Sequence, residues 1–293
     1  MNLYQQHRLL TGAAAAAVIV AGAYVIRSYN VDASKAERKV FGRGPSFTSL
    51  RVHSVENINH DTKRLRFSLP NKNVTSGLSL TSAVLTFSKP SGHLLPVVRP
   101  YTPTSNLDEP GYLDLVVKRY PKGKASNHLH SLKPGQSLFF LAAIQGYQWK
   151  RNEFSHITLV AGGAGITPMY QLIQGIFNDP KETAKVTLVH GINSDEDAIF
   201  RAEFAKYEED FPERFSVVYT ASHPVEASPF RKGYVTGDLI REANEKLGGK
   251  SDKVFVCGPP PMEAALIGTS GLFGAGGGIL AQLGFSKGQI FKF

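Results

Sequence analysis

The chain has 293 residues, 42% of them hydrophobic, which is enough to bury two ordinary cores. Its single cysteine, Cys257, cannot form an internal disulfide or a cysteine-rich zinc or iron–sulfur site, so no metal site is expected. The formal charge of +9 is uneven, because residues 1–150 hold 19 Lys and Arg against 7 Asp and Glu, whereas residues 151–293 hold 14 against 17.

The excess positive charge of the first half favours some partners over others. Most of these charges are expected to be ordinary solvated surface residues. No run of Lys and Arg is interleaved with aromatic residues, so nucleic-acid binding is not predicted. The charge fits an acidic protein partner or an anionic membrane surface.

The first predicted element is an uncharged run at residues 9–26, flanked by Arg8 and Arg27. Its length reaches the range of a membrane-spanning helix, so we expect residues 1–33 to form a single-pass membrane anchor. A cleaved secretory signal is the alternative, although the run is long for one. The arginine-flanked, acidic-poor start resembles mitochondrial targeting sequences, which favours a mitochondrial anchor over one in the endoplasmic reticulum. Residues 28–51 are expected to be a polar tether.

Alternation of apolar and polar residues follows the tether and predicts β-strands. Turns rich in Pro, Gly, Asn and Ser separate the runs, which is typical of a small antiparallel Greek-key barrel. We therefore expect an all-β barrel domain over residues 34–150. Its predicted strands are RLRFSL (residues 64–69), AVLTFS (83–88), YLDLVVKRY (112–120) and SLFFLAAI (137–144).

The pattern changes near residue 151 to short apolar strands with helical segments between them. Such alternation predicts an α/β domain with a doubly wound parallel sheet, over residues 151–293. The predicted strands are HITLVA (residues 156–161), KVTLVHG (185–191), FSVVYT (215–220) and KVFVCG (253–258). The predicted helices include residues 168–177 and 197–209.

Three short segments carry unusual chemistry. RPYTPTS, residues 99–105, combines a guanidinium, a phenol and three hydroxyls on a backbone stiffened by two prolines, which suits a flat ligand. GGAGITP, residues 162–168, joins a buried strand to a helix and predicts a diphosphate cradle, with a plain tight turn as the alternative. CGPPPM, residues 257–262, rigidifies another strand exit; a lone cysteine such as Cys257 is more often small core filler.

These motifs make the chain resemble a known family. RPYTPTS, LVVKRY (residues 115–120), GKAS (123–126), GGAGITPM (162–169) and CGPPPM follow the order and approximate spacing of the ferredoxin-NADP reductase-like flavoproteins. The resemblance covers residues 47–293 and is strongest to the NADH-cytochrome b5 reductases. The N-terminal run and the IFKF ending resemble their fungal mitochondrial form. The resemblance implies FAD bound by the barrel and NADH bound by the α/β domain.

The resemblance implies that three motifs bind FAD, namely RPYTPTS, LVVKRY and GKAS. Arg99 would bind the diphosphate, Tyr101 would pack along the flavin and ribityl chain, and Thr102 would hydrogen-bond the isoalloxazine, roles that suit these side chains. Lys118 would border FAD and also reach the nicotinamide nucleotide. The other FAD-binding residues that the resemblance implies are Pro100, Val116, Tyr120, Gly123, Lys124, Ala125 and Ser126. Strand packing is the alternative for Val116 and Tyr120.

The resemblance also implies which residues bind NADH. Those at the diphosphate and flavin-facing loop are Gly162, Gly163, Gly165 and Thr167. Those at the nicotinamide are Cys257, Gly258, Pro259 and Met262. Thr102, Lys118 and Cys257 would then be the catalytic residues nearest the reacting rings. Cys257 would orient the rings rather than attack, because hydride passes directly between them.

The expected activity is electron transfer from NADH through FAD to cytochrome b5 or a similar acidic haem protein. The expected state is a monomer anchored in the mitochondrial outer membrane, with the intermembrane space as a further location. A same-fold flavin reductase serving another acceptor is one alternative. A catalytically silent, membrane-tethered nucleotide-binding protein is another.

Several residues depart from the family pattern. Ala164 replaces the threonine of the glycine-rich loop, and Ala125 replaces the usual methionine before Ser126. Ser222 stands where NADH-selective members tend to carry an aspartate. NADH is still expected, because the sequence places no obvious arginine beside residues 219–222 to bind a 2′-phosphate.

Two further features favour ordinary structural roles. The run GLFGAGGG, residues 271–278, is expected to be a flexible insertion before the last helix. His60 is expected to be a surface-turn residue, with a proton relay near the flavin as the alternative.

Overall fold

The computed structural model describes residues 39–42, 45–90, 95–268 and 277–293. The predicted anchor over residues 1–33 and most of the glycine-rich run at 271–278 lie outside them. None of the helices in the described ranges combines the length and the apolar character needed to cross a membrane.

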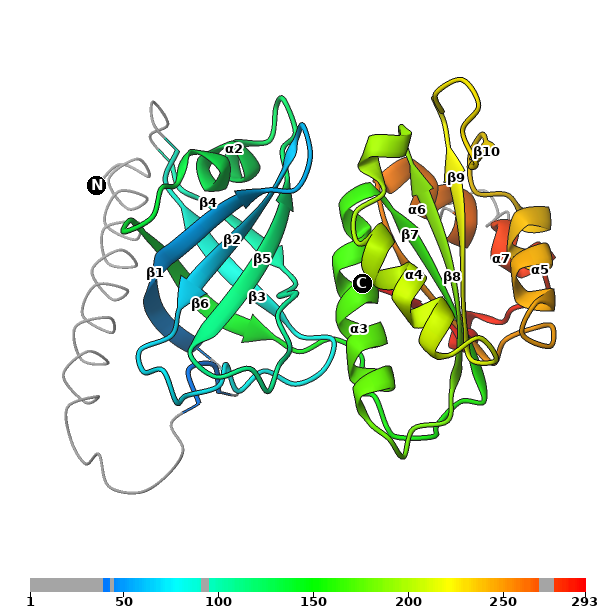
Figure 1. Ribbon diagram of the computed structural model, residues 1–293, viewed down its shortest axis with the longest axis horizontal. Helices are drawn as coiled ribbons and strands as arrows, with labels where there is room; N and C mark the ends of the chain where they lie inside the picture. The colour runs from blue at the N-terminus through cyan, green and yellow to red at the C-terminus, as the bar shows by residue number, and fades with distance from the viewer. Residues whose placement is uncertain (1–38, 43–44, 91–94, 269–276) are drawn as a thin grey trace, which may run out of the picture. The chain divides into compact units, whose positions relative to one another are not determined.

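The first part of the described chain forms one six-stranded antiparallel sheet, which confirms the β-rich fold that the alternation predicts (Figure 1). The strand order is β4-β3-β6-β1-β2-β5. The elements are β1 (Pro45–Asn57), β2 (Thr62–Ser68), β3 (Ala83–Ser88), β4 (Val97–Tyr101), β5 (Tyr112–Lys118), the helix α2 (Lys124–Ser131) and β6 (Ser137–Ile144). Alternate residues of these strands, such as Leu65, Phe67, Leu113, Leu115 and Phe140, are fully buried and form the core of the barrel domain.

Strand β1 corrects the predicted tether. Residues 45–51 belong to β1 and pair with β6, and β1 pairs with β2 on its other side from Arg51 onward. Leu50 and Val52 are 1% exposed, so the alternation of this strand does bury a face. The prediction of a polar tether was wrong from Pro45 onward, because the run of Ser, Thr, Arg and His between the apolar residues is the solvent face of a strand.

Strand β4, at the edge of this sheet, carries Arg99, Pro100 and Tyr101 of the RPYT segment, and Thr102 follows it. Arg99 lies opposite Thr86 and Pro100 lies opposite Leu85. A proline has no N–H to donate and is tolerated in an edge strand, whereas a central strand would lose a ladder hydrogen bond. Edge placement therefore explains how Pro100 is compatible with a strand and leaves this segment available to a ligand.

The second part of the described chain forms a six-stranded parallel sheet of order β10-β9-β8-β7-β11-β12. This confirms the predicted α/β domain. Its strands are β7 (His156–Gly162), β8 (Lys185–Ile192), β9 (Phe215–Ala221), β10 (Arg231–Lys232), β11 (Lys253–Cys257) and β12 (Ile290–Lys292). Its helices are α3 (Ile166–Asn178), α4 (Arg201–Asp210), α5 (Gly237–Glu245), α6 (Pro260–Ile267) and α7 (Ile279–Gln282), with 3-10 turns η1 (Gly163–Gly165), η2 (Asp195–Asp197) and η3 (Lys287–Gln289).

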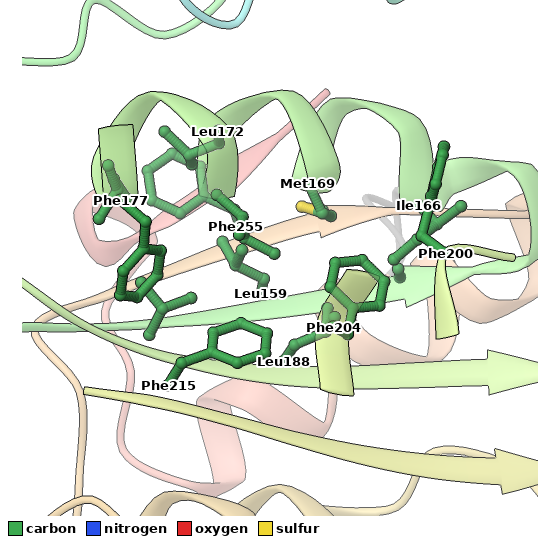
Figure 2. Close-up of a cluster of buried hydrophobic side chains, with 14 of the residues drawn as sticks. Leu159, Ile166, Met169, Leu172, Phe177, Leu188, Phe200, Phe204, Phe215 and Phe255 are labelled. Carbon is green, nitrogen blue, oxygen red and sulfur yellow. The ribbon is translucent and has the colours of Figure 1, made fainter. Parts of the chain in front are cut away.

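Helices cover both faces of the parallel sheet. On one face, Met169 and Leu172 of α3 and Phe204 of α4 pack against Leu159 and Leu188, all of them fully buried (Figure 2). On the other face, α5, α6 and α7 contribute to a second cluster with the opposite side chains of the strands. Two covered faces explain why the strands are nearly continuous apolar runs.

Helix α4 begins later than the sequence predicts. Residues 195–197 form a separate 3-10 turn, and Phe200 has a left-handed backbone with φ of 63°. The Ser194 side chain and the Asp197 carboxylate cap each other's backbone, and this capping box fixes where the 3-10 turn begins. The turn places Asp197 toward the barrel domain, as its contacts below show.

Candidate active site

The strand order places two loops of the α/β domain side by side. The chain runs from β7 outward through β8 and β9, then returns to place β11 on the other side of β7. In such sheets, ligands bind outside the carboxyl ends of the strands where the order reverses, here β7 and β11. The loops that leave these two strands are residues 162–168 and 257–262, the two motifs that the sequence singled out.

Glycine is required where these loops touch. A Cβ on Gly165 would lie 2.2 Å from the Cys257 carbonyl oxygen, closer than any real contact. A Cβ on Gly162 would lie 2.5 Å from Met262 Sδ. Gly163 has a positive φ of 51°, which a side chain would strain. The missing side chains thus let one loop lie directly against the other.

A cleft of about 1370 Å³ opens over these loops and is also lined by the barrel domain. Its volume exceeds the roughly 300–1,000 Å³ of a site for one drug-sized ligand, which suits two nucleotides. Of the residues predicted for the two nucleotides, only Gly163 and Met262 do not line it. The predicted residues in its lining are Arg99, Pro100, Tyr101, Thr102, Val116, Lys118, Tyr120, Gly123, Lys124, Ala125, Ser126, Gly162, Gly165, Thr167, Cys257, Gly258 and Pro259.

The barrel side of the cleft begins at β4. Arg99 is exposed, and among the described residues its Nη1 donates to the neighbouring Val98 carbonyl at 2.8 Å, which leaves other guanidinium donors to meet an anion. Burial raises the pKa of Tyr101 to about 12, against a smaller opposite effect of Arg99, so its phenol stays protonated. A cation, a protonated phenol and the Thr102 hydroxyl thus face one ligand space.

The N-terminus of α2 is a second feature of the barrel side. No side chain caps it, and no acidic residue lies in its first turn. Ser126 Oγ donates to the Gly123 carbonyl at 3.0 Å and accepts from the Tyr120 N–H at 3.2 Å, which holds the loop before the helix in shape. Free N-terminal amides beside Lys124 suit a phosphate group. These donors fit the diphosphate of FAD.

The α/β side offers a similar arrangement at α3. Its N-cap is Gly165, again without a side-chain cap, and Thr167 Oγ1 donates to the Ala164 carbonyl at 3.2 Å. Sequence reasoning missed His190 of β8, whose Nε2 donates to the Gly163 carbonyl at 3.4 Å. Burial lowers the pKa of His190 to about 4, so the ring supports the loop as a neutral donor.

Cys257 stays a thiol in this environment. Burial, with a smaller contribution from Glu263, raises the pKa of Cys257 to about 12. A neutral, buried thiol is a poor nucleophile. Glu263 also accepts from the Gly258 N–H at 3.3 Å and pairs with Lys292 at 2.6 Å, which fixes the loop against the end of the chain. Sequence reasoning did not identify the C-terminal residues Phe291–Phe293 as part of the cleft lining.

Lys118 differs from its predicted role in one respect. It lines the cleft, but its ammonium lies 2.5 Å from both Asp61 Oδ2 and Asp197 Oδ1. Burial opposes the charge on Lys118, yet hydrogen bonds to Asp197 and Asp61 outweigh it and raise the pKa of Lys118. Neither carboxylate was identified from the sequence, because they lie 57 and 79 residues from Lys118 along the chain.

The residues beside Ser222 correct one step of the cofactor argument. The sequence suggested no cation near residues 219–222, but the short strand β10 pairs with β9 and places Arg231 opposite Thr220 and Lys232 opposite Ala221. Arg231 pairs with Glu242 at 2.7 Å, and both side chains are about half exposed. The argument that favoured NADH because no arginine lies near residues 219–222 was therefore wrong. The expectation of NADH does not depend on that argument alone.

His60 lies where a surface turn was predicted. Its side chain is 52% exposed, and its ring nitrogens lie 3.6 Å from Asp61 and 3.3 Å from Glu196. It is not part of the cleft lining. The predicted surface-turn position is confirmed, and the alternative of a proton relay near the flavin stays a prediction.

Comparisons with known proteins agree with this geometry. The family described as the oxidoreductase FAD-binding domain matches residues 49–148, and the oxidoreductase NAD-binding domain matches residues 159–267. The chain is 45% identical over 277 residues to NADH-cytochrome b5 reductase 2 of Neosartorya fischeri, covering 93% of this chain and 86% of that protein. It is 43% identical over 259 residues to the protein of that name from Pyricularia oryzae, covering 87% and 78%.

Solved structures share the fold. The cytochrome b5 reductase domain of Ulva prolifera nitrate reductase has a TM-score of 0.74 at 25% identity, covering 87% of this chain and all of that one. The CS-b5R domains of human Ncb5or give a TM-score of 0.71 at 23% identity, covering 85% and 70%, which supports the fold alone. With two matching oxidoreductase domains and relatives of this identity over most of its length, the chain belongs to the NADH-cytochrome b5 reductase family.

Proposed function

We propose that this chain takes two electrons from NADH onto bound FAD and passes them singly to cytochrome b5 or a similar acidic haem protein. The observation that carries the proposal is the shared cleft, which joins the RPYT strand of the barrel to the two glycine- and proline-containing loops of the α/β domain. Bound FAD would supply the hydride and one-electron chemistry that no side chain here provides. The task of the protein is then to hold two rings together.

The barrel residues hold and orient FAD in this proposal. Arg99 and the uncapped N-terminus of α2 bind the diphosphate, because both present N–H donors to an anion. The protonated phenol of Tyr101 packs along the cofactor. The Thr102 hydroxyl hydrogen-bonds the ring system from the same strand end.

The α/β residues hold and orient NADH. The amides of residues 163–167 meet its diphosphate, and His190 fixes the loop that carries them. The neutral Cys257 packs against the nicotinamide and excludes water without reacting. Contact between Gly165 and Cys257 places the phosphate loop and the nicotinamide loop in one rigid unit.

Positive charge at the rim of the cleft favours an acidic acceptor. Lys122 and Lys124 are exposed and line the cleft, and the exposed Arg119 precedes them. Cations at the rim of a redox site attract an acidic partner and orient it, in a salt-dependent encounter. We expect the rate of cytochrome b5 reduction at low acceptor concentration to fall as ionic strength rises.

Residues 1–33 favour a location at a membrane. The uncharged run at 9–26 between two arginines supports a single membrane-spanning helix, and we propose that it anchors a monomer in the mitochondrial outer membrane. Separation of mitochondria, endoplasmic reticulum and intermembrane space, followed by alkaline extraction of the membranes, tests it. A truncated chain of residues 34–293 should be extracted where the full chain is retained; equal extraction of both would contradict the anchor.

The activity is tested with a preparation of residues 34–293. A yellow protein whose flavin is bleached by NADH and reoxidised by cytochrome b5 supports the proposal. Bleaching without haem reduction would indicate a flavin reductase with another acceptor. A protein that cannot be loaded with FAD would indicate a silent nucleotide-binding protein and would contradict the proposal.

A further inference from the structure

Three side chains from distant parts of the sequence join the barrel domain to the α/β domain beside the cleft. Asp61 lies between β1 and β2, Lys118 ends β5, and Asp197 ends the 3-10 turn η2. We call these three residues the Lys118 link. The exposed fractions of their side chains are 20%, 7% and 6%, so the link is largely shielded from water.

Each carboxylate of the link is held on its own domain. Asp197 Oδ2 accepts from the Ser194 N–H and hydroxyl at 3.0 and 2.9 Å, which leaves Oδ1 for Lys118. Asp61 Oδ1 accepts from Thr62 Oγ1 at 2.9 Å, which leaves Oδ2 for Lys118. The ammonium therefore bridges two acceptors that their own domains have already oriented.

Neighbouring contacts support the same junction. Asn59 Nδ2 donates to the Glu196 carbonyl at 2.8 Å. His60, Asp61 and Asp197 also bring three potential ligand atoms within 4.8 Å of one another, but Lys118 occupies the space between the two carboxylates. The cluster is thus completed by a cation of the chain itself.

We propose that the Lys118 link is a positioning device that sets the distance between the flavin and nicotinamide subsites, with Asp61 and Asp197 as positioning residues. Two of the three ammonium donors of Lys118 are used by the carboxylates, so Lys118 serves the link rather than binding the nucleotide. The inference rests on the proposed function, because the distance matters only if hydride passes across the cleft.

The chemistry of a shielded ion pair suits this role. Such a pair often adds little net stability, because desolvation offsets the attraction, but its geometry is specific. Hydride transfer is sensitive to geometry, since a displacement of about 1 Å can cost about 100-fold in rate. A link that adds little stability and fixes one distance would therefore act mainly on the rate.

A second, uncharged side chain also connects the barrel domain to the α/β domain. Gln171 of α3 is 1% exposed, and its Nε2 donates to the Ser82 carbonyl at 3.2 Å and the Pro103 carbonyl at 3.1 Å. This amide also joins the two domains. Loss of the Lys118 link should thus loosen the junction without separating the domains.

The experiment uses the FAD-loaded protein and the variants D197N and K118M. The matched control is D179N, which removes a carboxylate paired with Arg151 at 2.5 Å within the α/β domain; neither residue lines the cleft. The readouts are the limiting rate of flavin reduction at saturating NADH, the NADH concentration for half-maximal rate, and hydrogen exchange of the amides of residues 59–61 and 194–197. K118R, which keeps a cation, tests rescue, and D61N repeats the test from the barrel side should D197N not fold.

We expect D197N and K118M to lower the limiting rate about tenfold or more, with the half-maximal NADH concentration changed less than about threefold. Hydrogen exchange at both segments should accelerate in these variants, while their FAD content should match the wild type. The D179N control should match the wild type in every readout. K118R should recover part of the rate.

A D197N variant with the wild-type limiting rate or wild-type exchange would overturn the proposal. So would K118M raising only the half-maximal NADH concentration while D197N has no effect, because Lys118 would then be a nucleotide ligand. Failure of the wild type to be reduced by NADH would instead contradict the proposed function, and the exchange measurement would still test the link.

Discussion

The two sides of the cleft hold their ligands in different ways. The barrel side uses Arg99 and Tyr101 on an edge strand and Thr102 directly after it, supplemented by the N-terminus of α2. The α/β side uses the backbone of glycine loops, packed so closely that Gly165 touches Cys257. We therefore expect substitutions on the barrel side to lower the affinity for FAD by graded amounts. On the α/β side, we expect substitutions that disturb the packing of the loops to lower activity with NADH.

The largest expected effect is on the support beneath the α/β loop. His190 is fully buried, its pKa is lowered to about 4 by burial, and Nδ1 has no partner among the described residues. Between pH 6.5 and 4 the unfolded chain binds a proton that the folded chain does not, so the free energy of unfolding falls as the pH falls through this window. The loss is roughly 3 kcal/mol at pH 4.

Denaturant unfolding at several pH values measures this effect. In a His190→Gln variant, the decrease in the free energy of unfolding between pH 6.5 and 4 should be smaller by that amount. This holds whatever the stability of the variant at pH 7. An unchanged pH dependence in the variant would show that other groups, such as the buried His156, carry the effect.

The next effect concerns the contact between the two loops. A Gly165→Ala substitution forces a Cβ against the Cys257 carbonyl, so one loop must move. We expect kcat/KM for NADH to fall about 100-fold with FAD content unchanged. Gly288→Ala, where nothing lies within 4 Å of the added Cβ, is the control and should match the wild type. Loss of FAD from the Gly165 variant would show that the two sides are not independent.

A graded effect is expected on the barrel side. Replacing Arg99 by leucine removes charge-assisted hydrogen bonds to a diphosphate, which are worth about 1.5–3 kcal/mol, so FAD affinity should fall about 30-fold. Fluorescence titration of the FAD-free protein measures the affinity, and excess FAD should restore activity. Arg51→Leu, on the exposed face of β1, is the matched control. Equal loss in both variants would indicate a general charge effect instead of a specific contact.

The smallest effect concerns nucleotide choice at the end of β9. Arg231 and Lys232 lie opposite Thr220 and Ala221, so a 2′-phosphate near Ser222 would meet cations. A Ser222→Asp substitution should lower kcat/KM for NADPH about tenfold relative to NADH, because a carboxylate repels the phosphate and accepts from a ribose hydroxyl. An unchanged ratio would place the ribose away from this strand end.

Much of this architecture could be predicted from the sequence. Strands β3 and β6 match their predicted ranges, because alternating residues with turn residues at both ends define a strand without help from the rest of the chain. The glycine and proline loops could also be recognised, because glycine and proline residues themselves indicate which backbone conformations a loop needs. Family resemblance added the roles of individual residues, which remain predictions for Arg99, Thr102 and Cys257.

Other features depended on tertiary contacts that a linear pattern does not contain. Residues 45–51 of β1 resemble a tether in sequence because the polar face of the strand is rich in Ser, Thr and Arg, and only the pairing of β1 with β2 and β6 shows the buried face. The partners of Lys118 come from two distant segments. The cations beside Ser222 depend on a two-residue strand too short to have a pattern.

The central claim is that FAD and NADH meet in one cleft between the barrel strand and the α/β loops. A crystal structure of the protein with FAD and NAD⁺ bound tests it most directly. We predict that the two rings lie against each other between Thr102 and Cys257, with one diphosphate at α2 and the other at α3. Nucleotides found in separate cavities, with no shared contact, would contradict the account.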